Sequence, residues 1–190
     1  DKFGRVVSIE GDTLAVGAPY EGSNQTTITN GTSASADNSR GESGAVYVYK
    51  RSGSTWAQEA YIKAANNVNY RTRGSSFGED VSIDGDTLAV GASHENNSLT
   101  TITNGTSAST ITVEKTRSGA VFVYKRSGTN WAQQAYIKAS NADAGDLFGS
   151  SVSIDGDTLA VGTYVEKSNQ TTITNSDTAS SNNSNTLAGA

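Results

Sequence analysis

The sequence has no cysteine and no methionine, and it has one proline and one histidine. The absence of cysteine excludes a disulfide framework and any thiolate-based site. The net charge of −5 gives no sign of the basic face that a nucleic acid or an anionic membrane would require. No apolar run approaches the roughly 20 residues that span a bilayer. We therefore expect neither nucleic-acid binding nor membrane insertion.

Hydrophobic residues make up 34% of the 190 residues and lie in short islands between tracts rich in serine, threonine, asparagine and glycine. A chain of this length can still bury a core. The sequence begins at Asp1 with no methionine and no signal-like segment. We therefore expect its natural start to be missing or removed.

Repetition is the dominant feature of the chain. The stretch DGDTLAVGA at 84–92 follows a Phe-Gly pair, and similar cassettes occur at 3–18 and 148–163. The Phe-Gly pairs begin at positions 3, 77 and 148, spacings of 74 and 71 residues. Self-similarity at such a spacing is typical of repeat architectures. The expected units are a first repeat at 1–73, a second at 74–144 and a partial third at 145–190.

Each cassette predicts a β-hairpin. In the first copy, Val6–Ile9 and Thr13–Val16 are rich in β-branched residues and flank Glu10-Gly11-Asp12, where the later copies have Asp-Gly-Asp. Glycine in such a junction accepts the positive φ of a tight turn. A third and a fourth strand are predicted in the first two repeats, at 44–53 and 56–63 and again at 119–128 and 131–138.

The sequence thus predicts an all-β fold of four-stranded antiparallel blades, with a long connection between strands two and three. The third copy has only its first two strands, and no helical periodicity appears. Valines and aromatics alternate along the third strand, which indicates that both of its faces are covered. The fourth strand alternates only in part, so we expect it to form the more exposed edge of the sheet.

The long connection contains Thr-Thr-Ile-Thr-Asn at 26–30, and this run recurs at 100–104 and 171–175. It has strand propensity despite its polar surroundings. Two interpretations stay open: a protruding, partly ordered excursion stacked on its neighbour from the adjacent repeat, or a solvated linker duplicated with the rest.

The order of Phe-Gly, a β-hairpin, Val16-Gly17-Ala18-Pro19 and Gly-Ala-Val-Tyr-Val-Tyr at 44–49 resembles the FG-GAP repeat. That family includes the β-propeller blades of integrin α-subunits, and this version is similar to its bacterial members. The resemblance implies propeller-type blades, about two and a half repeats here, in a non-catalytic extracellular or cell-surface protein. Propellers close with about four to eight blades, so a longer chain, an assembly of copies or an open stack would complete the architecture.

Calcium is the cofactor that the resemblance raises, because integrin-type blades place several acidic residues between strands one and two. Here that loop is a tight turn, and calcium requires six to eight oxygen ligands. We therefore expect no cofactor and interpret the turn acids as turn-forming residues. Glu21, Glu95 and Glu166 align after strand two and are interpreted as solvated loop carboxylates. The weak calcium candidates are Asp84, Asp86, Asp155, Asp157, Asp143, Asp146 and Glu95.

No catalytic constellation is visible, because His94 has neither a nucleophile partner nor a pair of carboxylates beside it in the sequence. We predict that the chain is not an enzyme. The aromatics of the third strands are expected in an inter-blade core: Tyr47, Tyr49, Phe122 and Tyr124. Trp56 and Trp131 are expected to anchor the outer strands rather than to contact sugar. The basic pairs at 50–51 and 125–126 are expected to be solvated.

Sequons for N-glycosylation lie in the long connections, and in a secreted eukaryotic chain they would mark exposed loops. The candidates are Asn24, Asn30, Asn96, Asn104, Asn169 and Asn182.

Two functional hypotheses follow. The first is an extracellular interaction module whose long polar loops bind another protein or a glycan. The second is a structural subunit of an extracellular filament, sheath or surface layer, in which copies of the chain associate by blade stacking. The near-identical repeats favour the second, because identical surfaces make repeated self-contacts easy, and the family resemblance favours the first.

Overall fold

The computed structural model describes residues 1–67, 74–106, 115–175, 182 and 184. All regular elements among these residues are strands, as the sequence predicts, and none of them forms a helix that could cross a membrane. Parts of the second polar connection (107–114) and of the serine- and asparagine-rich tail (176–181, 183 and 185–190) lie outside the described residues.

Blade 1 is a five-stranded antiparallel sheet with the order β1-β2-β4-β5-β3. Its hairpin turns are tight because Gly11 adopts a φ of 53° between β1 and β2, as the sequence predicts for this junction. The strands are β1 (Val6–Glu10), β2 (Thr13–Ala18), β3 (Thr29–Asn30), β4 (Ala45–Ser52) and β5 (Thr55–Ile62).

Blade 2 repeats this architecture with the order β6-β7-β9-β10-β8. Gly85 has a φ of 54° at the equivalent turn. The strands are β6 (Val81–Asp84), β7 (Thr87–Ala92), β8 (Thr103–Asn104), β9 (Ala120–Ser127) and β10 (Asn130–Ile137).

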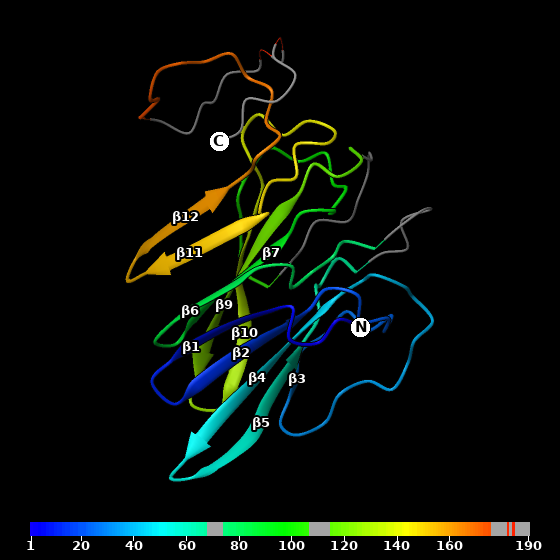
Figure 1. The fold of residues 1–190 in the computed structure, drawn as a ribbon, viewed down its shortest axis with the longest axis vertical. Coiled ribbons are helices and arrows are strands. Elements are labelled where there is room, and N and C mark those ends of the chain that lie inside the picture. Colours follow the sequence, from blue (N-terminus) through cyan, green and yellow to red (C-terminus); the bar gives the residue numbers. More distant parts are fainter. Residues whose placement is uncertain (68–73, 107–114, 176–181, 183, 185–190) are drawn as a thin grey trace.

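The third sheet has two strands, β11 (Ser151–Asp155) and β12 (Thr158–Gly162), which pair antiparallel. Among the described residues, the third copy forms this one hairpin. The three sheets follow one another along the long axis of the molecule (Figure 1). They contact each other through the first strand of each sheet, here called its innermost strand: β1 contacts β6, and β6 contacts β11.

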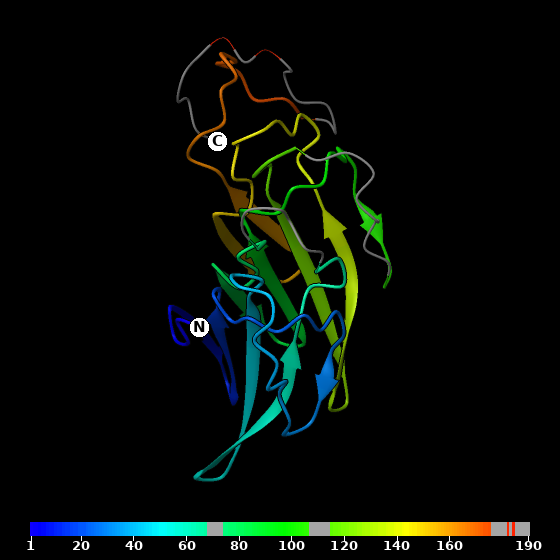
Figure 2. The same cartoon turned by 90° about the vertical axis from the view of Figure 1, so that its right-hand side faces the viewer.

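The fifth strand of each blade corrects one prediction. The sequence predicts strand four as the exposed edge, but the polar excursion returns and pairs with it, so that Thr29 faces Tyr61 and Thr103 faces Tyr136. The Thr-Thr-Ile-Thr-Asn run is therefore a partly ordered excursion in both blades, and the interpretation as a free linker is wrong there. Figure 2 shows β3 lying beside β5.

The blades stack through unlike faces. The valine face of blade 1, with Val46 and Val48, shares one buried cluster with Phe77, Phe122 and Tyr124 on the aromatic face of blade 2. The rings of Phe77 and Phe122 meet edge to face at 5.3 Å. This confirms the predicted inter-blade core for the blade 2 aromatics.

The valine face of blade 2 packs on the third sheet in the same way, with Val121 against Val152 and half-buried Phe148. On the outer face of blade 1, Tyr47 and Tyr49 are only half-buried, because no blade among the described residues precedes them.

Candidate functional site

The Phe-Gly motif fixes each blade against the one before it. Phe77 forms an isolated parallel bridge with Gly44 of blade 1, and Phe148 forms the same bridge with Gly119 of blade 2. A Cβ atom added at Gly17 would overlap the carbonyl oxygen of Gly78. The glycines of the repeat are therefore required because two backbones approach closely at the seam between blades.

The innermost strands are joined by side-chain to backbone hydrogen bonds. The amide of Ile83 on β6 donates to Ser8 Oγ on β1 at 3.1 Å, and the amide of Ile154 on β11 donates to Ser82 Oγ on β6 at 3.1 Å. The serine of one repeat thus satisfies a backbone donor of the next, which sets the register between blades.

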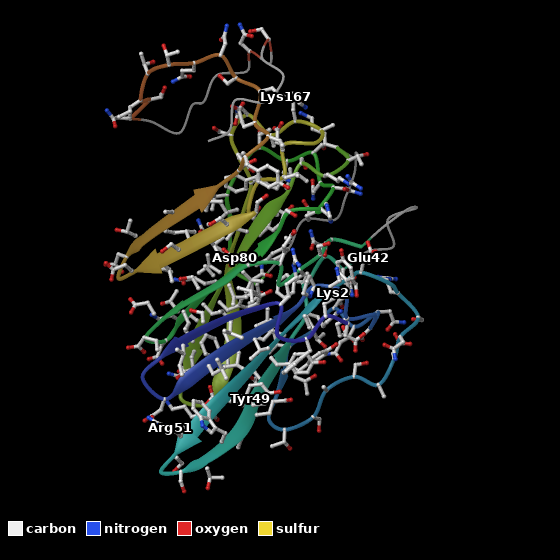
Figure 3. The ribbon with its side chains drawn as sticks, viewed as in Figure 1. Lys2, Glu42, Tyr49, Arg51, Asp80 and Lys167 are labelled. Atoms are coloured by element: carbon white, nitrogen blue, oxygen red, sulfur yellow. The ribbon has the colours of Figure 1, made fainter. Side chains whose placement is uncertain are left out.

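Two aspartates, Asp84 in β6 and Asp80 immediately before it, extend this connection to the third sheet. Asp80 Oδ2 accepts a hydrogen bond from the amide of Val152 at 2.8 Å, and Figure 3 places Asp80 between the second and third sheets. Asp84 Oδ2 accepts from the amide of Gly156 at 2.7 Å. Asp84, a calcium candidate, is therefore bound to the turn of the next repeat.

A buried ion pair lies at the base of each excursion. In blade 1, Lys63 Nζ is 2.6 Å from Glu21 Oε2 and 2.8 Å from Ser43 Oγ. Both charged side chains are at most 4% exposed. The other carboxylate oxygen, Glu21 Oε1, accepts from the amide of Ser23 at 3.0 Å, which fixes the first residues of the excursion.

Blade 2 contains the same Glu-Lys centre. Lys138 Nζ is 2.8 Å from Glu95 Oε2 and 2.8 Å from Ser118 Oγ, and the ion-paired side chains are fully buried. Burial lowers the pKa of Lys138, and attraction to Glu95 opposes that shift. Asn66 Nδ2 of blade 1 donates to Glu95 Oε1 at 3.0 Å and so connects the two blades.

These centres overturn the interpretation of Glu21 and Glu95 as solvated loop carboxylates. A signal was present in the sequence, because a glutamate after strand two and a lysine after strand four both recur in the first two repeats. Opposite charges that recur at fixed places in each repeat could have been paired.

The outer part of the seam is held by a second charged group. Arg126 of β9 lies 3.2 Å from Glu59 of β5 and 2.7 Å from Asp86. Trp131 Nε1 donates to Glu59 Oε1 at 2.8 Å, and the Asn30 amide group hydrogen-bonds both backbone groups of Trp131. Trp131 is 2% exposed, as an anchor should be. The prediction that the basic pair at 125–126 is solvated is wrong for Arg126, whose side chain is 10% exposed.

The remaining calcium candidates are dispersed. Asp155 at the end of β11 and Asp157 in the β11–β12 turn are exposed, and Asp143 pairs with Lys115 at 3.0 Å. Asp146 is 2% exposed, and burial raises its pKa. The described part of the chain contains no group of three or more histidine, aspartate or glutamate side chains arranged to hold a metal ion.

The sequons differ in accessibility. Asn96 is 6% exposed, and its Oδ1 accepts from the amide of Arg117 at 2.7 Å. Asn30 is exposed but its amide is bound to Trp131. The other candidates are all exposed: Asn24, Asn104, Asn169 and Asn182.

His94 does have a hydroxyl neighbour that sequence reasoning missed, because Ser76 Oγ lies 2.7 Å from its Nδ1. Ser76 is 1% exposed and has a φ of 52°, at a position occupied by Lys2 and Leu147 in the other repeats. Ser76 is buried at the seam, whereas His94 is partly exposed.

A model of the FG-GAP repeat matches residues 1–49, 56–124 and 131–179. The chain belongs to the FG-GAP repeat family. No curated protein matches it. The match at 56–124 runs from β5 of blade 1 into β9 of blade 2 and therefore includes the Phe-Gly seam between the blades. The all-β sheets are partial β-propeller blades of this family.

Proposed function

We propose that the chain is a non-catalytic extracellular or cell-surface interaction module that binds a protein or a glycan through its long polar connections. The observation that carries this proposal is topological. The β2–β4 and β7–β9 connections leave from the same side of their sheets, and the hairpin turns lie on the opposite side (Figure 1).

The excursions are held in defined shapes, which a binding surface requires. Asn67 Nδ2 donates to the carbonyl oxygens of Ser23 and Gln25, at 2.9 and 2.8 Å. Gln25 Nε2 in turn donates to the Thr27 carbonyl oxygen and to Thr29 Oγ1, both at 2.9 Å. Together with the buried glutamate below, these bonds fix the excursion and reduce the entropy that binding would cost.

The exposed part of the excursions offers hydroxyl groups. The threonine pairs at 26–27, 100–101 and 171–172 are exposed in all three copies. Hydroxyls both donate and accept hydrogen bonds, which suits a ligand rich in hydroxyl or peptide groups. The family and this chemistry support a location outside the cell.

A binding screen tests the proposal. The protein is applied to a printed glycan array and to immobilised collagen and fibronectin. A variant in which the six threonines of these pairs are alanines should bind the recognised surface at least tenfold more weakly with the same melting temperature. The matched control carries Thr55→Ala and Thr129→Ala at hairpin turns on the opposite side and should bind normally. Absence of binding to every surface, or binding that the six substitutions leave unchanged, would overturn the proposal.

One observation favours the structural alternative, in which copies stack into a filament, sheath or surface layer. Phe3, Val7 and Ile9 on the outer face of blade 1 are 56%, 59% and 62% exposed. Their counterparts in blade 2 are covered by blade 1, and unlike faces that associate head to tail form rings or filaments. Sedimentation velocity should then show assemblies that grow with concentration and that Val7→Glu abolishes. An interaction module stays monomeric over the same range.

A further inference from the structure

We propose that a buried turn between blades 1 and 2 couples their two polar excursions, so that ordering one excursion favours the ordered state of the other. Excursion 1 is residues 19–44, between β2 and β4, and excursion 2 is residues 93–119, between β7 and β9. As a device that regulates binding, the coupling rests on the proposed function. The coupling itself needs no ligand and is measured without one.

The turn at 64–67 follows β5. The amide of Asn67 donates to the carbonyl oxygen of Ala64 at 3.1 Å, which closes the turn. Asn66 and Asn67 are 5% and 3% exposed. Buried carboxamides are hydrogen-bonded as a rule, and these two adjacent side chains have their partners in different blades.

Asn67 is held by excursion 1. Its Nδ2 donates to the carbonyl oxygens of Ser23 and Gln25, at 2.9 and 2.8 Å, and its own carbonyl oxygen accepts from Arg40 Nη1. The amide of Arg40 donates to the carbonyl oxygen of Gly22 at 2.7 Å, which joins the returning arm of the excursion to the outgoing one. Asn67 therefore contacts both arms of excursion 1, and none of these hydrogen bonds reaches excursion 2.

Asn66 is held by the base of excursion 2. Its Nδ2 donates to Glu95 Oε1 at 3.0 Å. Glu95 Oε2 accepts from the amide of Asn97 at 3.0 Å, and Asn97 Oδ1 accepts from the amide of Leu99 at 3.0 Å. Asn66 Oδ1 is buried without a hydrogen-bond partner in the described part of the chain, so the contact with Glu95 orients this carboxamide. Through Glu95 the turn is bonded to the first residues of excursion 2.

The coupling follows from the adjacency of Asn66 and Asn67. The two residues share one planar peptide unit, so a displacement of one carboxamide displaces the other. When excursion 1 opens, Asn67 loses its acceptors, the turn is released, and the hydrogen bond from Asn66 to Glu95 weakens. A ligand that orders excursion 1 favours the closed turn and thereby lowers the entropic cost of ordering excursion 2. The effect is reciprocal, because coupling free energies are shared by both sites.

The equivalent turn after β10 keeps only part of this arrangement and serves as an internal comparison. Asn141 Nδ2 donates to Glu166 Oε1 at 3.0 Å, as in the first turn, and Lys115 Nζ donates to the carbonyl oxygen of Ala142 at 2.7 Å. Ala142 stands in place of Asn67, however, and has no carboxamide with which to hold excursion 2. We therefore expect weaker coupling between excursion 2 and the third repeat than between excursions 1 and 2.

Amide hydrogen exchange followed by NMR tests the coupling at three equivalent amides. Those of Ser23, Asn97 and Ser168 each donate to the glutamate of their own repeat. In Asn67→Ala, exchange should accelerate about tenfold at Ser23 and about fivefold at Asn97. Exchange at Ser168 and in the strands should stay unchanged, which a general loss of stability would not allow.

A double-mutant cycle tests whether the effect passes through the turn. Asn66→Ala should accelerate exchange at Asn97 directly and at Ser23 through the turn. Adding Asn67→Ala to that variant should change exchange at Asn97 no further, because the connection is already broken. Asn66→Ser is the smaller substitution at this position and replaces Asn66→Ala in the cycle if the alanine variant does not fold.

Three results would overturn the proposal: unchanged exchange at Asn97 in Asn67→Ala, equal acceleration at all three amides, or a further acceleration at Asn97 in the double variant. The exchange rates are measured on the protein alone, so a binding screen without a positive result leaves them unaffected. Failure of the coupling would likewise leave ligand binding by each separate excursion intact, and the two failures are distinguishable.

Discussion

Lys138 Nζ lies 2.8 Å from Glu95 Oε2 with both side chains fully buried. The blade 1 pair of Lys63 and Glu21 repeats the contact at 2.6 Å. The cost of desolvating two such charges largely offsets their attraction. What the pair fixes instead is position, because it joins the end of strand four to the start of the excursion.

Substituting Lys138 with methionine should therefore lower the free energy of unfolding by about 3–5 kcal/mol, because Glu95 is left buried and uncompensated. Denaturant unfolding measures the loss. Adding Glu95→Gln should restore part of it, since the unpaired charge is then removed. Lys125→Met, at an exposed lysine of β9, is the control and should cost less than about 1 kcal/mol. Equal losses at the two lysines would contradict the buried pair.

Asp146 makes a prediction about pH. Burial raises its pKa above the usual 3.8, while the hydrogen bond from the Asp143 amide and the charge of Lys167 oppose that shift, and the charges of Asp143 and Glu166 add to it. The folded state therefore binds this proton more tightly than the unfolded state. The stabilisation is complete below pH 3.8 and is lost as the pH rises through the folded pKa. Asp146→Asn should be more stable than the parent at pH 7, and this advantage should disappear near pH 3. An advantage of the same size at both values would rule out titration of Asp146.

The hairpins and the blade faces could be predicted from local sequence. The Asp-Gly junction demands a positive φ, and alternation along strands three places valines and aromatics on opposite faces. The Glu-Lys centres could not be found in the same way, because Glu95 and Lys138 are brought together only by the fold. The role of Arg126 could not be predicted either, because its partner Glu59 belongs to the other blade. The strand β3 forms only because the polar excursion returns to pair with β5, and local propensity does not determine whether that excursion is a strand or a loop.

The seam predicts a steric requirement at Gly91. A Cβ atom there would overlap the carbonyl oxygen of Gly149, which belongs to the backbone and cannot rotate away. Gly91→Ala should cost about 1–3 kcal/mol or more, as overpacking of a closed core does. Gly41→Ala is the control, since no atom lies within 4 Å of its added Cβ and the residue is exposed. Thermal unfolding of both variants tests this requirement. Equal melting temperatures would contradict the close approach of Gly91 to the Gly149 carbonyl oxygen.

Arg126 and Arg51 occupy the same place in the two blades but differ in burial. Arg126 bridges Glu59 and Asp86 and is 10% exposed, whereas Arg51 pairs with Asp12 and is 46% exposed. Arg126→Ala should cost about 2–4 kcal/mol, because Glu59 loses a desolvated partner. Arg51→Ala should cost less than about 1 kcal/mol, as exposed pairs do. Chemical denaturation measures both losses in the free energy of unfolding. Equal losses would contradict the role of Arg126 at the seam between the blades.

Consecutive blades are joined, in register, by hydrogen bonds from the backbone of one innermost strand to side chains of the innermost strand before it. Amide hydrogen exchange at Ile154, followed by NMR in the parent and in Ser82→Ala, tests it most directly. Ser82 Oγ accepts that amide at 3.1 Å. Exchange at Ile154 should accelerate at least tenfold in the variant, while Ser153→Ala, the equivalent exposed serine of β11, should leave inter-sheet amides unchanged. Unaltered exchange at Ile154 in Ser82→Ala would contradict the account.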